Sequence, residues 1–386
     1  MLIMFVLGIQ IPNACEMSGK KINFSFSKIE LSNNKPMEKL NKKPLRGICF
    51  MQEDKGRDTE IVLPIVYGAE KFLNCKIDFR LKWNAHLIYK ENPDFVIIPT
   101  NCIGSKMYHD IAKYCYRQNI KIFSFISEGN FNDKIEYNYF GFNDDKVFYQ
   151  EYVCSWSERT QKYIQERSPE QADKIVLTGA SGFDRFNIYK FTSKEDFLKK
   201  YNKTKYKKVI TYAGWAFGKL QYQQGLNELK PFAEKQEKGY DWIEEQRQKV
   251  RDSLRYAIEN NPDILFVLKQ HPAEYFPGLT LEQRNEMSEL THYENVLYIQ
   301  GHIEGIHDLI SVADILLGFE TTSAIETWVM GDKPTIFLND EPNFTRVDIY
   351  KGCLLAKDGK QLNDYVSTFY KNGKIEIKNL EYKYPD

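Results

Sequence analysis

The sequence predicts an α/β protein with two Rossmann-like doubly wound domains that face a common cleft, and three observations support this prediction. From residue 45 onward, short apolar strand-like runs alternate with longer amphipathic segments, as in parallel β-α-β units. The alternation is interrupted by a lysine-rich stretch and starts again at residue 208. A chain of 386 residues is also too long for one ordinary core and about right for two.

The elements of the first domain follow from these runs. We predict a helix at 106–118, because Ile111, Tyr114 and Cys115 recur at helical spacing. The predicted strands are the apolar runs at 46–51, 95–99, 120–126 and 174–178.

The second domain repeats the pattern with more elements. Its predicted strands are 208–212, 264–269, 295–299, 314–317 and 335–338, and its predicted helices are 242–260, 306–312 and 323–330. Because open α/β sheets bind ligands at the carboxyl ends of their strands, we expect the functional residues just after these strands.

These assignments place the first domain at 44–187 and the second at 208–350, joined by a lysine-rich linker at 188–207. The linker is either a solvated surface or a basic patch that touches anionic lipid. We expect residues 1–43 to be a disordered or mis-assigned leader, since their apolar start is too short to span a bilayer. The C-terminal segment, 351–386, could cross back to the first domain.

The composition argues against several function classes. The 53 basic and 53 acidic residues cancel, so the chain has no global field that would gather nucleic acid. Seven cysteines are scattered without a CxxC pair, which argues against a zinc ribbon or a disulfide framework and favours a reducing compartment. The sequence has no HExxH, EF-hand loop or Asp-x-Asp triplet, so we predict no metal site. The lack of a GxGxxG or Walker loop disfavours NAD enzymes and P-loop ATPases.

The most specific segment lies between the strand at 314–317 and the helix at 323–330. Thr321, Thr322 and Ser323 place three hydroxyls at a helix N-terminus, where free N–H groups and the helix dipole favour a phosphate. Ser323 and Glu326 also have the spacing of a capping box, which is a routine way to begin a helix.

Two further segments follow strands. His271 and Pro272 come after the strand at 264–269, where the imidazole could donate to a phosphate and stabilise a leaving nucleotide. Glu128 comes after the strand at 120–126 and could act as a general base, although an ordinary loop glutamate has the same pattern. Gly214 and Trp215 follow the first strand of the second domain, where we expect the backbone to approach a donor closely.

These segments, in this order, resemble those of GT-B glycosyltransferases that use CMP-activated acidic sugars. Bacterial sialyltransferases and polysialyltransferases of that kind carry an acidic-Gly motif, a His-Pro motif and a later Ser/Thr pair. The counterparts here are Glu128-Gly129, His271-Pro272 and Thr322-Ser323. The sequence departs from the pattern at Ser127, where that family often has a second acidic residue.

The layout over residues 45–345 is also similar to the bacterial surface carbohydrate biosynthesis protein group. This likeness rests on the Gly-x-x-x-Phe-Asp turn at 179–184, the His-Pro turn, and a Thr-Thr-x-x-x-Glu segment followed by Gly-Asp-Lys-Pro at 331–334.

The resemblance implies an inverting, metal-independent glycosyltransferase whose first domain binds the acceptor and whose second binds the nucleotide-sugar donor. Glu128 would be the base, His271 would contact the donor phosphate, Thr322 and Ser323 would hold that phosphate, and Glu326 would bind the ribose. The donor would be a CMP-linked nonulosonic acid or Kdo, with no other cofactor. The acceptor would be a bacterial surface glycan or a lipid-linked glycan.

Other functions fit the same pattern. A UDP-sugar 2-epimerase or a CDP-glycerol-type transferase would use the same fold, and a non-catalytic GT-B binding module is kept open by Ser127. Because sugar nucleotides are cytoplasmic, we expect a cytoplasmic protein, with peripheral contact to the inner membrane through the linker lysines.

Overall fold

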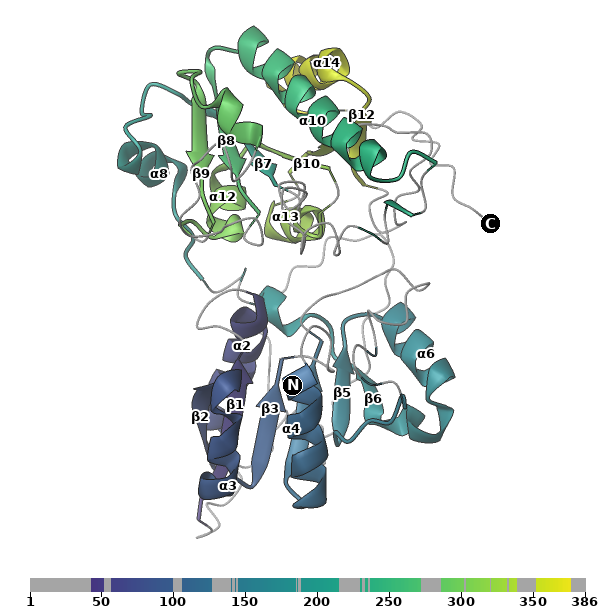
Figure 1. The fold of residues 1–386 in the computed structure, drawn as a ribbon. Helices are drawn as coiled ribbons and strands as arrows, with labels where there is room; N and C mark the ends of the chain where they lie inside the picture. The colour runs from purple at the N-terminus through teal and green to yellow at the C-terminus, as the bar shows by residue number, and fades with distance from the viewer. Residues whose placement is uncertain are drawn as a thin grey trace. The chain divides into compact units, whose positions relative to one another are not determined.

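The computed structural model describes two compact units, which meet in the sequence after residue 185 (Figure 1). The described residues are 43–51, 57–99, 106–126, 140, 143, 145–184, 186, 189–214, 230, 233–234, 237–271, 286–301, 303–319, 321–331, 333–338 and 352–375. Apart from residue 43, the predicted leader lies outside them.

The first unit is built on a six-stranded sheet with the order β2-β1-β3-β4-β5-β6, in which every neighbouring pair is parallel. All four predicted strands are present, and β2 and β5 are additional. The strands are β1 (Leu45–Met51), β2 (Cys75–Leu81), β3 (Phe95–Ile98), β4 (Lys121–Phe125), β5 (Tyr152–Ser155) and β6 (Ile175–Leu177).

Helices cover both faces of this sheet because neighbouring strand residues point to opposite sides. Ile48 of β1 packs with the predicted helix, now α4, whereas Cys49 packs with α2. The helices are α2 (Arg57–Phe72), α3 (Ile88–Glu91), α4 (Lys106–Arg117) and α6 (Glu158–Arg167), with 3-10 turns η2 (Lys82–Leu87), η3 (Pro169–Lys174) and η4 (Ser181–Asp184).

The second unit has another parallel six-stranded sheet, ordered β12-β11-β10-β7-β8-β9, which is the strand order of the Rossmann fold. The order reverses between β7 and β10, so the topological switch point lies between these two strands. Every predicted strand and helix of this domain is present. The strands are β7 (Lys208–Ala213), β8 (Ile264–Lys269), β9 (Val296–Ile299), β10 (Ile315–Gly318), β11 (Thr335–Leu338) and β12 (Leu354–Ala356).

Two helix layers enclose this sheet. The long helix α10 and the last helix α14 lie side by side on one face and share a core with β8 (Figure 1). The opposite face is covered by α8 and α12, through Phe197 and Leu309. The helices are α8 (Lys194–Lys200), α10 (Tyr240–Asn260), α12 (Ile306–Val312), α13 (Ser323–Gly331) and α14 (Gly359–Asn372), with the 3-10 turn η7 (Glu286–Leu290).

Residues 188–207, predicted as a linker, belong to the second unit wherever the structure describes them. The physical reason is apolar burial, because Phe197, Leu198 and Tyr206 join the core beneath β7 and β8. Lysines of this stretch and of the start of β7 are paired with carboxylates of the same unit. The pairs are Lys194–Asp314, Lys200–Glu304, Lys205–Glu294 and Lys208–Asp263.

Asp314, just before β10, makes polar contacts with α8 and α14, the first and last helices of the second unit. One carboxylate oxygen pairs with Lys194 of α8. The other accepts the backbone N–H of Val209 at 2.9 Å and the hydroxyl of Tyr370 from α14 at 3.1 Å. The C-terminal segment, as far as residue 375, therefore forms part of the second unit.

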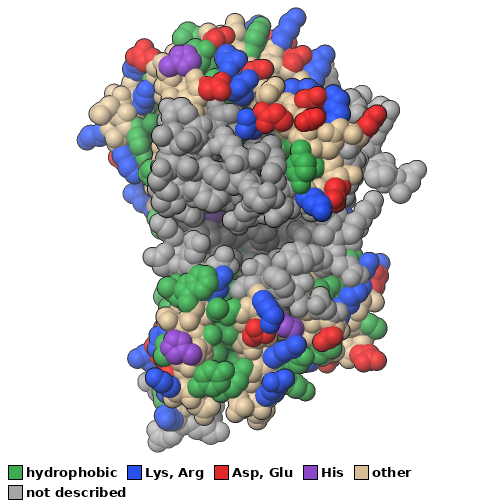
Figure 2. All heavy atoms as spheres, viewed as in Figure 1, with side chains coloured by type: hydrophobic (Ala, Val, Ile, Leu, Met, Phe, Trp, Pro, Cys, Tyr) green, Lys and Arg blue, Asp and Glu red, His purple; other side chains and the backbone are tan. Residues whose placement is uncertain are grey.

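The exposed surface carries both signs of charge. Figure 2 shows acidic and basic side chains intermixed on the visible face of the second unit, which agrees with the zero formal charge of the chain. No helix in the described part of the chain is both long and apolar enough to cross a membrane.

Candidate functional site

The candidate site lies at the carboxyl ends of β7, β8 and β10 in the second unit. The ladder pairs Ala213 with Lys269 on one side and with Gly318 on the other, so the three strands end at one edge of the sheet. Gly214 follows β7, His271 follows β8, and Thr321 and Thr322 follow β10. Gly214, His271, Thr321 and Thr322 are thus brought to the switch point, where open α/β sheets bind ligands.

Gly214 packs directly against the main chain that follows β8. Its N–H donates to the carbonyl oxygen of Lys269 at 2.8 Å. A β carbon at this position would lie 2.4 Å from that oxygen and 2.9 Å from the amide nitrogen of His271. Only glycine fits this approach without a shift of the backbone. Gly214 therefore allows the end of β7 to contact the chain leading to His271, whereas the close approach to a donor stays a prediction.

A buried polar cluster holds that chain in place. Lys269 is 5% exposed, and its ammonium donates to the carbonyl oxygens of Gln270 and Gly301. The Gln270 side-chain oxygen accepts the backbone N–H of Gly301 at 3.1 Å, and the backbone N–H of Gln270 donates to the carbonyl oxygen of Ile299. Sequence reasoning missed Lys269 and Gln270, although two polar residues at the end of an apolar strand could have indicated them.

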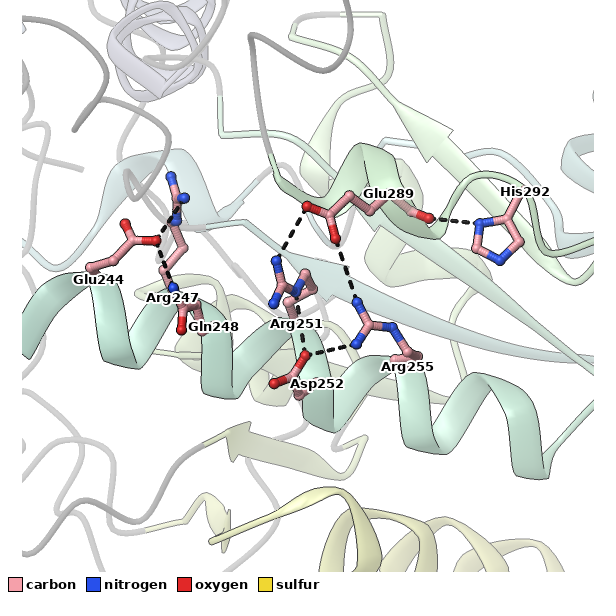
Figure 3. Close-up of polar contacts among 8 residues, drawn as sticks. All are labelled: Glu244, Arg247, Gln248, Arg251, Asp252, Arg255, Glu289 and His292. Carbon is pink, nitrogen blue, oxygen red and sulfur yellow. Dashed lines mark hydrogen bonds and ion pairs between the residues drawn. The ribbon is translucent and has the colours of Figure 1, made fainter.

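His271 is half-buried and is the last described residue before residue 286. The 3-10 turn η7 that begins there is joined to α10 by the ion pairs that Figure 3 shows. Glu289 of η7 lies between Arg251 and Arg255, with N–O distances of 3.2 and 3.5 Å. Both arginines also pair with Asp252 of α10, which links the helix and the turn into one network.

The three hydroxyl residues stand at the start of α13, as predicted. The Thr321 hydroxyl accepts the N–H of Ser323 at 3.2 Å, and the Thr322 carbonyl accepts that of Ile325. The side chain of Thr321 therefore caps the start of the helix. In a Ser323–Glu326 capping box, Ser323 would have to be the capping residue. The prediction of that capping box is wrong in this respect, because the Glu326 carboxylate lies against another helix.

Glu326 forms a buried pair with a residue that the sequence did not suggest. Its side chain is 3% exposed, and Oε1 lies 3.4 Å from Nε2 of His307 on α12. The His307 ring is itself buried and is flanked by Phe186 and Phe191, with centroid distances of 5.0 and 6.3 Å. No periodicity in the sequence connects α12 with α13, so this pair could be found only in three dimensions.

Lys333 fixes the end of α12 from the turn after α13. Its ammonium donates to the carbonyls of Ile310, Ser311 and Ala313 at 2.7 to 2.8 Å, which caps the C-terminus of α12. Burial lowers the pKa of Lys333 to about 8, against the opposing effect of Asp314.

Three predicted site residues, Glu128, Trp215 and Pro272, lie outside the described residues, so the base and part of the donor site stay predictions. Among the described residues there is no group of three or more His, Cys, Asp or Glu side chains placed to hold a metal ion.

Comparisons with known proteins identify the fold. Neither a protein-family model nor a curated protein sequence matches the chain. Many solved structures do match. A protein from Listeria monocytogenes described as a UDP-N-acetylglucosamine 2-epimerase has a TM-score of 0.57 and 12% identity, over 86% of this chain and 89% of that one.

Two other structures are similar to the same extent. The UDP-N-acetylglucosamine 2-epimerase of Neisseria meningitidis, bound to UDP-N-acetylglucosamine, has a TM-score of 0.53 and 12% identity over 86% of this chain and 92% of that one. The wall teichoic acid polymerase TagF has a TM-score of 0.51 and 12% identity over 84% and 79%. At this identity the likeness shows the fold alone, which is the GT-B fold of two α/β domains.

Proposed function

We propose that the protein is a GT-B enzyme that binds a nucleotide-activated sugar in its second unit and transfers the sugar to an acceptor hydroxyl. One observation carries the proposal. Gly214, His271 and the Thr321–Ser323 hydroxyls, which are far apart in the sequence, follow three adjacent strands at the switch point of a Rossmann-type sheet. A helix N-terminus at that place is suited to a phosphate.

Each residue has a role in the proposed reaction. Thr322 and Ser323 hold the phosphate next to the sugar, and His271 stabilises the charge that develops on it. Glu128 removes the proton of the acceptor hydroxyl, whose oxygen attacks the anomeric carbon from the opposite side. The bond from that carbon to the phosphate oxygen breaks, and the nucleotide leaves with the electron pair, so the configuration is inverted.

The proposed donor is a CMP-linked nonulosonic acid or Kdo, and the proposed acceptor is a bacterial surface glycan or its lipid-linked precursor. The motif pattern Glu-Gly, His-Pro and Thr-Ser supports this choice. The same pattern supports a metal-independent reaction in the cytoplasm. Contact of the protein with the inner membrane stays a proposal. Lys194, Lys200 and Lys205 already pair with carboxylates of the same unit, which argues against these lysines as the groups that bind anionic lipid.

A second candidate function is favoured by the structural comparisons. Three of the matched structures with a TM-score above 0.5 are described as UDP-N-acetylglucosamine 2-epimerases, and the TagF crystal was soaked with CDP-glycerol. An epimerase would convert a UDP-sugar without an acceptor, and a polyol-phosphate transferase would form a phosphodiester.

Calorimetry separates these possibilities. The protein is titrated with CMP, UDP and CDP, with and without magnesium, beside the variant His271→Ala. CMP binding that ignores magnesium and weakens in the variant supports the CMP-sugar transferase. Preference for UDP or CDP moves the assignment to the second candidate. Failure of all three to bind, with no turnover of any sugar nucleotide, would leave a non-catalytic GT-B binding module.

A further inference from the structure

We propose that His307 is a positioning residue, which orients the carboxylate of Glu326 toward the ribose of a bound nucleotide. The inference rests on the proposed function, because it supplies a partner for the residue that is expected to bind the ribose. It adds a residue from α12, an element to which the sequence assigned no functional role.

The first argument is the burial of charge. The Glu326 side chain is 3% exposed and that of His307 is 7% exposed. A carboxylate removed from water to this extent is costly unless a hydrogen-bond donor or a positive charge accompanies it. Nε2 of the His307 imidazole lies 3.4 Å from the carboxylate oxygen Oε1, within ion-pair distance when the ring is protonated. The two side chains therefore form one unit across α12 and α13.

The second argument is that the histidine is held from several directions. Phe186 and Phe191 flank the ring, each at an interplanar angle of 50°. The helix that carries His307 packs on α13 and is capped at its C-terminus by the Lys333 ammonium. Because the imidazole is held in one position, it holds the neighbouring Glu326 carboxylate in one orientation. A binding group needs such support from the residues around it.

The third argument is the position of Glu326 along α13. Glu326 lies four residues after Thr322, hence on the same face and about 6 Å further along the helix. A phosphate bound at the start of α13 places the next part of a nucleotide, its ribose, about that far away. Each carboxylate oxygen accepts more than one hydrogen bond, so contact with His307 is compatible with contact to a ribose hydroxyl.

The experiment compares ribonucleotides with their 2′-deoxy counterparts. Dissociation constants for UDP, CMP, 2′-deoxy-UDP and 2′-deoxy-CMP are measured by calorimetry on the full chain, with folding checked by circular dichroism. We expect the unmodified protein to prefer the ribonucleotide that it binds by about tenfold, the usual weight of a hydrogen bond to a charged group. Glu326→Gln should reduce that preference.

Variants at His307 then test the positioning role. His307→Leu should abolish the ribose preference while the affinity for the 2′-deoxy nucleotide stays the same. His307→Gln, whose amide can still donate, should restore part of the preference. The matched control is His292→Gln, since His292 is exposed and contacts only the Glu289 carbonyl among the interactions in Figure 3.

Two results would overturn the inference alone. One is a ribose preference that survives in His307→Leu. The other is an equal loss of affinity for both kinds of nucleotide, which would show a merely structural pair. An unmodified protein that binds none of the four nucleotides would overturn the proposed function, and the inference with it.

Discussion

Gly214 meets Lys269 so closely that a β carbon on the glycine would lie 2.4 Å from the lysine carbonyl oxygen. The contact is between backbones, so no side-chain rotation can relieve it. It ties the end of β7 to the chain that carries His271, and several predictions depend on this edge of the sheet.

Gly214→Ala should lower the free energy of unfolding by about 1–3 kcal/mol, the usual cost of overpacking, and should weaken nucleotide binding. Chemical denaturation and calorimetry measure the two effects. The control is Gly68→Ala in α2, where a β carbon would have nothing within 4 Å and should stabilise the helix by roughly 0.5–1 kcal/mol. Equal stability of the Gly214 variant and the unmodified protein would refute the argument.

Thr322→Ala and Ser323→Ala should each weaken nucleotide binding by about two- to tenfold, the weight of one neutral hydrogen bond. Binding of the corresponding nucleoside, which has no phosphate, should stay the same. Thr327→Ala is the control, because the Thr327 hydroxyl donates within α13 to the Ser323 carbonyl and should affect stability only. A loss that is equal for nucleoside and nucleotide would speak against phosphate binding here.

Glu128→Gln should reduce turnover by about 10²–10⁴-fold, which is the contribution of a general base, and leave the donor affinity unchanged. Steady-state kinetics together with calorimetry test both parts. The outcome that removes Glu128 from the mechanism is intact turnover in this variant.

Lys333 should make stability depend on pH in the alkaline range. Burial lowers its pKa in the folded protein from 10.5 to about 8, so between these values the unfolded chain binds more protons. Stability then rises with pH across this window and is lower below it. Denaturation curves from pH 7.5 to 10 should show a smaller rise for Lys333→Met than for the unmodified protein. The same slope in both proteins would contradict the shifted pKa.

Glu289→Gln should cost no more than about 1 kcal/mol, because the Glu289 carboxylate of the ion pairs in Figure 3 is open to water. The Glu289 side chain is 53% exposed, so salt should screen its pairs with Arg251 and Arg255. Denaturation at low and at 1 M salt measures the effect. A cost that persists at high salt would show that Glu289 stabilises η7 by more than these screened ion pairs.

The strands of the second unit were predictable because their residues are buried on both faces. All six residues of β8 are buried, so the strand is a continuous apolar run. The strands not predicted have weaker signals. β2 and β12 lie at sheet edges, and β2 contains the charged residues Lys76, Asp78 and Arg80.

The part of the candidate site that follows strand ends could be predicted from the sequence. Parallel strands end at one edge, so Gly214, His271 and the hydroxyls after β10 were expected together. The partner of Glu326 could not be predicted, because the contact with His307 depends on how two helices pack. For the same reason the capping box was misassigned, since local spacing does not show that a neighbouring helix receives the carboxylate.

The hydrogen bonds of Asp314 bear on the order in which the protein matures during synthesis. Domains generally fold as units, beginning with the one nearest the N-terminus. The first unit has its last strand, β6, before any of the second unit has been made. In the second unit, Asp314 obtains Lys194 and Val209 early but Tyr370 only after α14 has been synthesised. The second unit is therefore completed last, and until α14 has been made the apolar residues of the sheet and of α10 that α14 buries stay exposed to water.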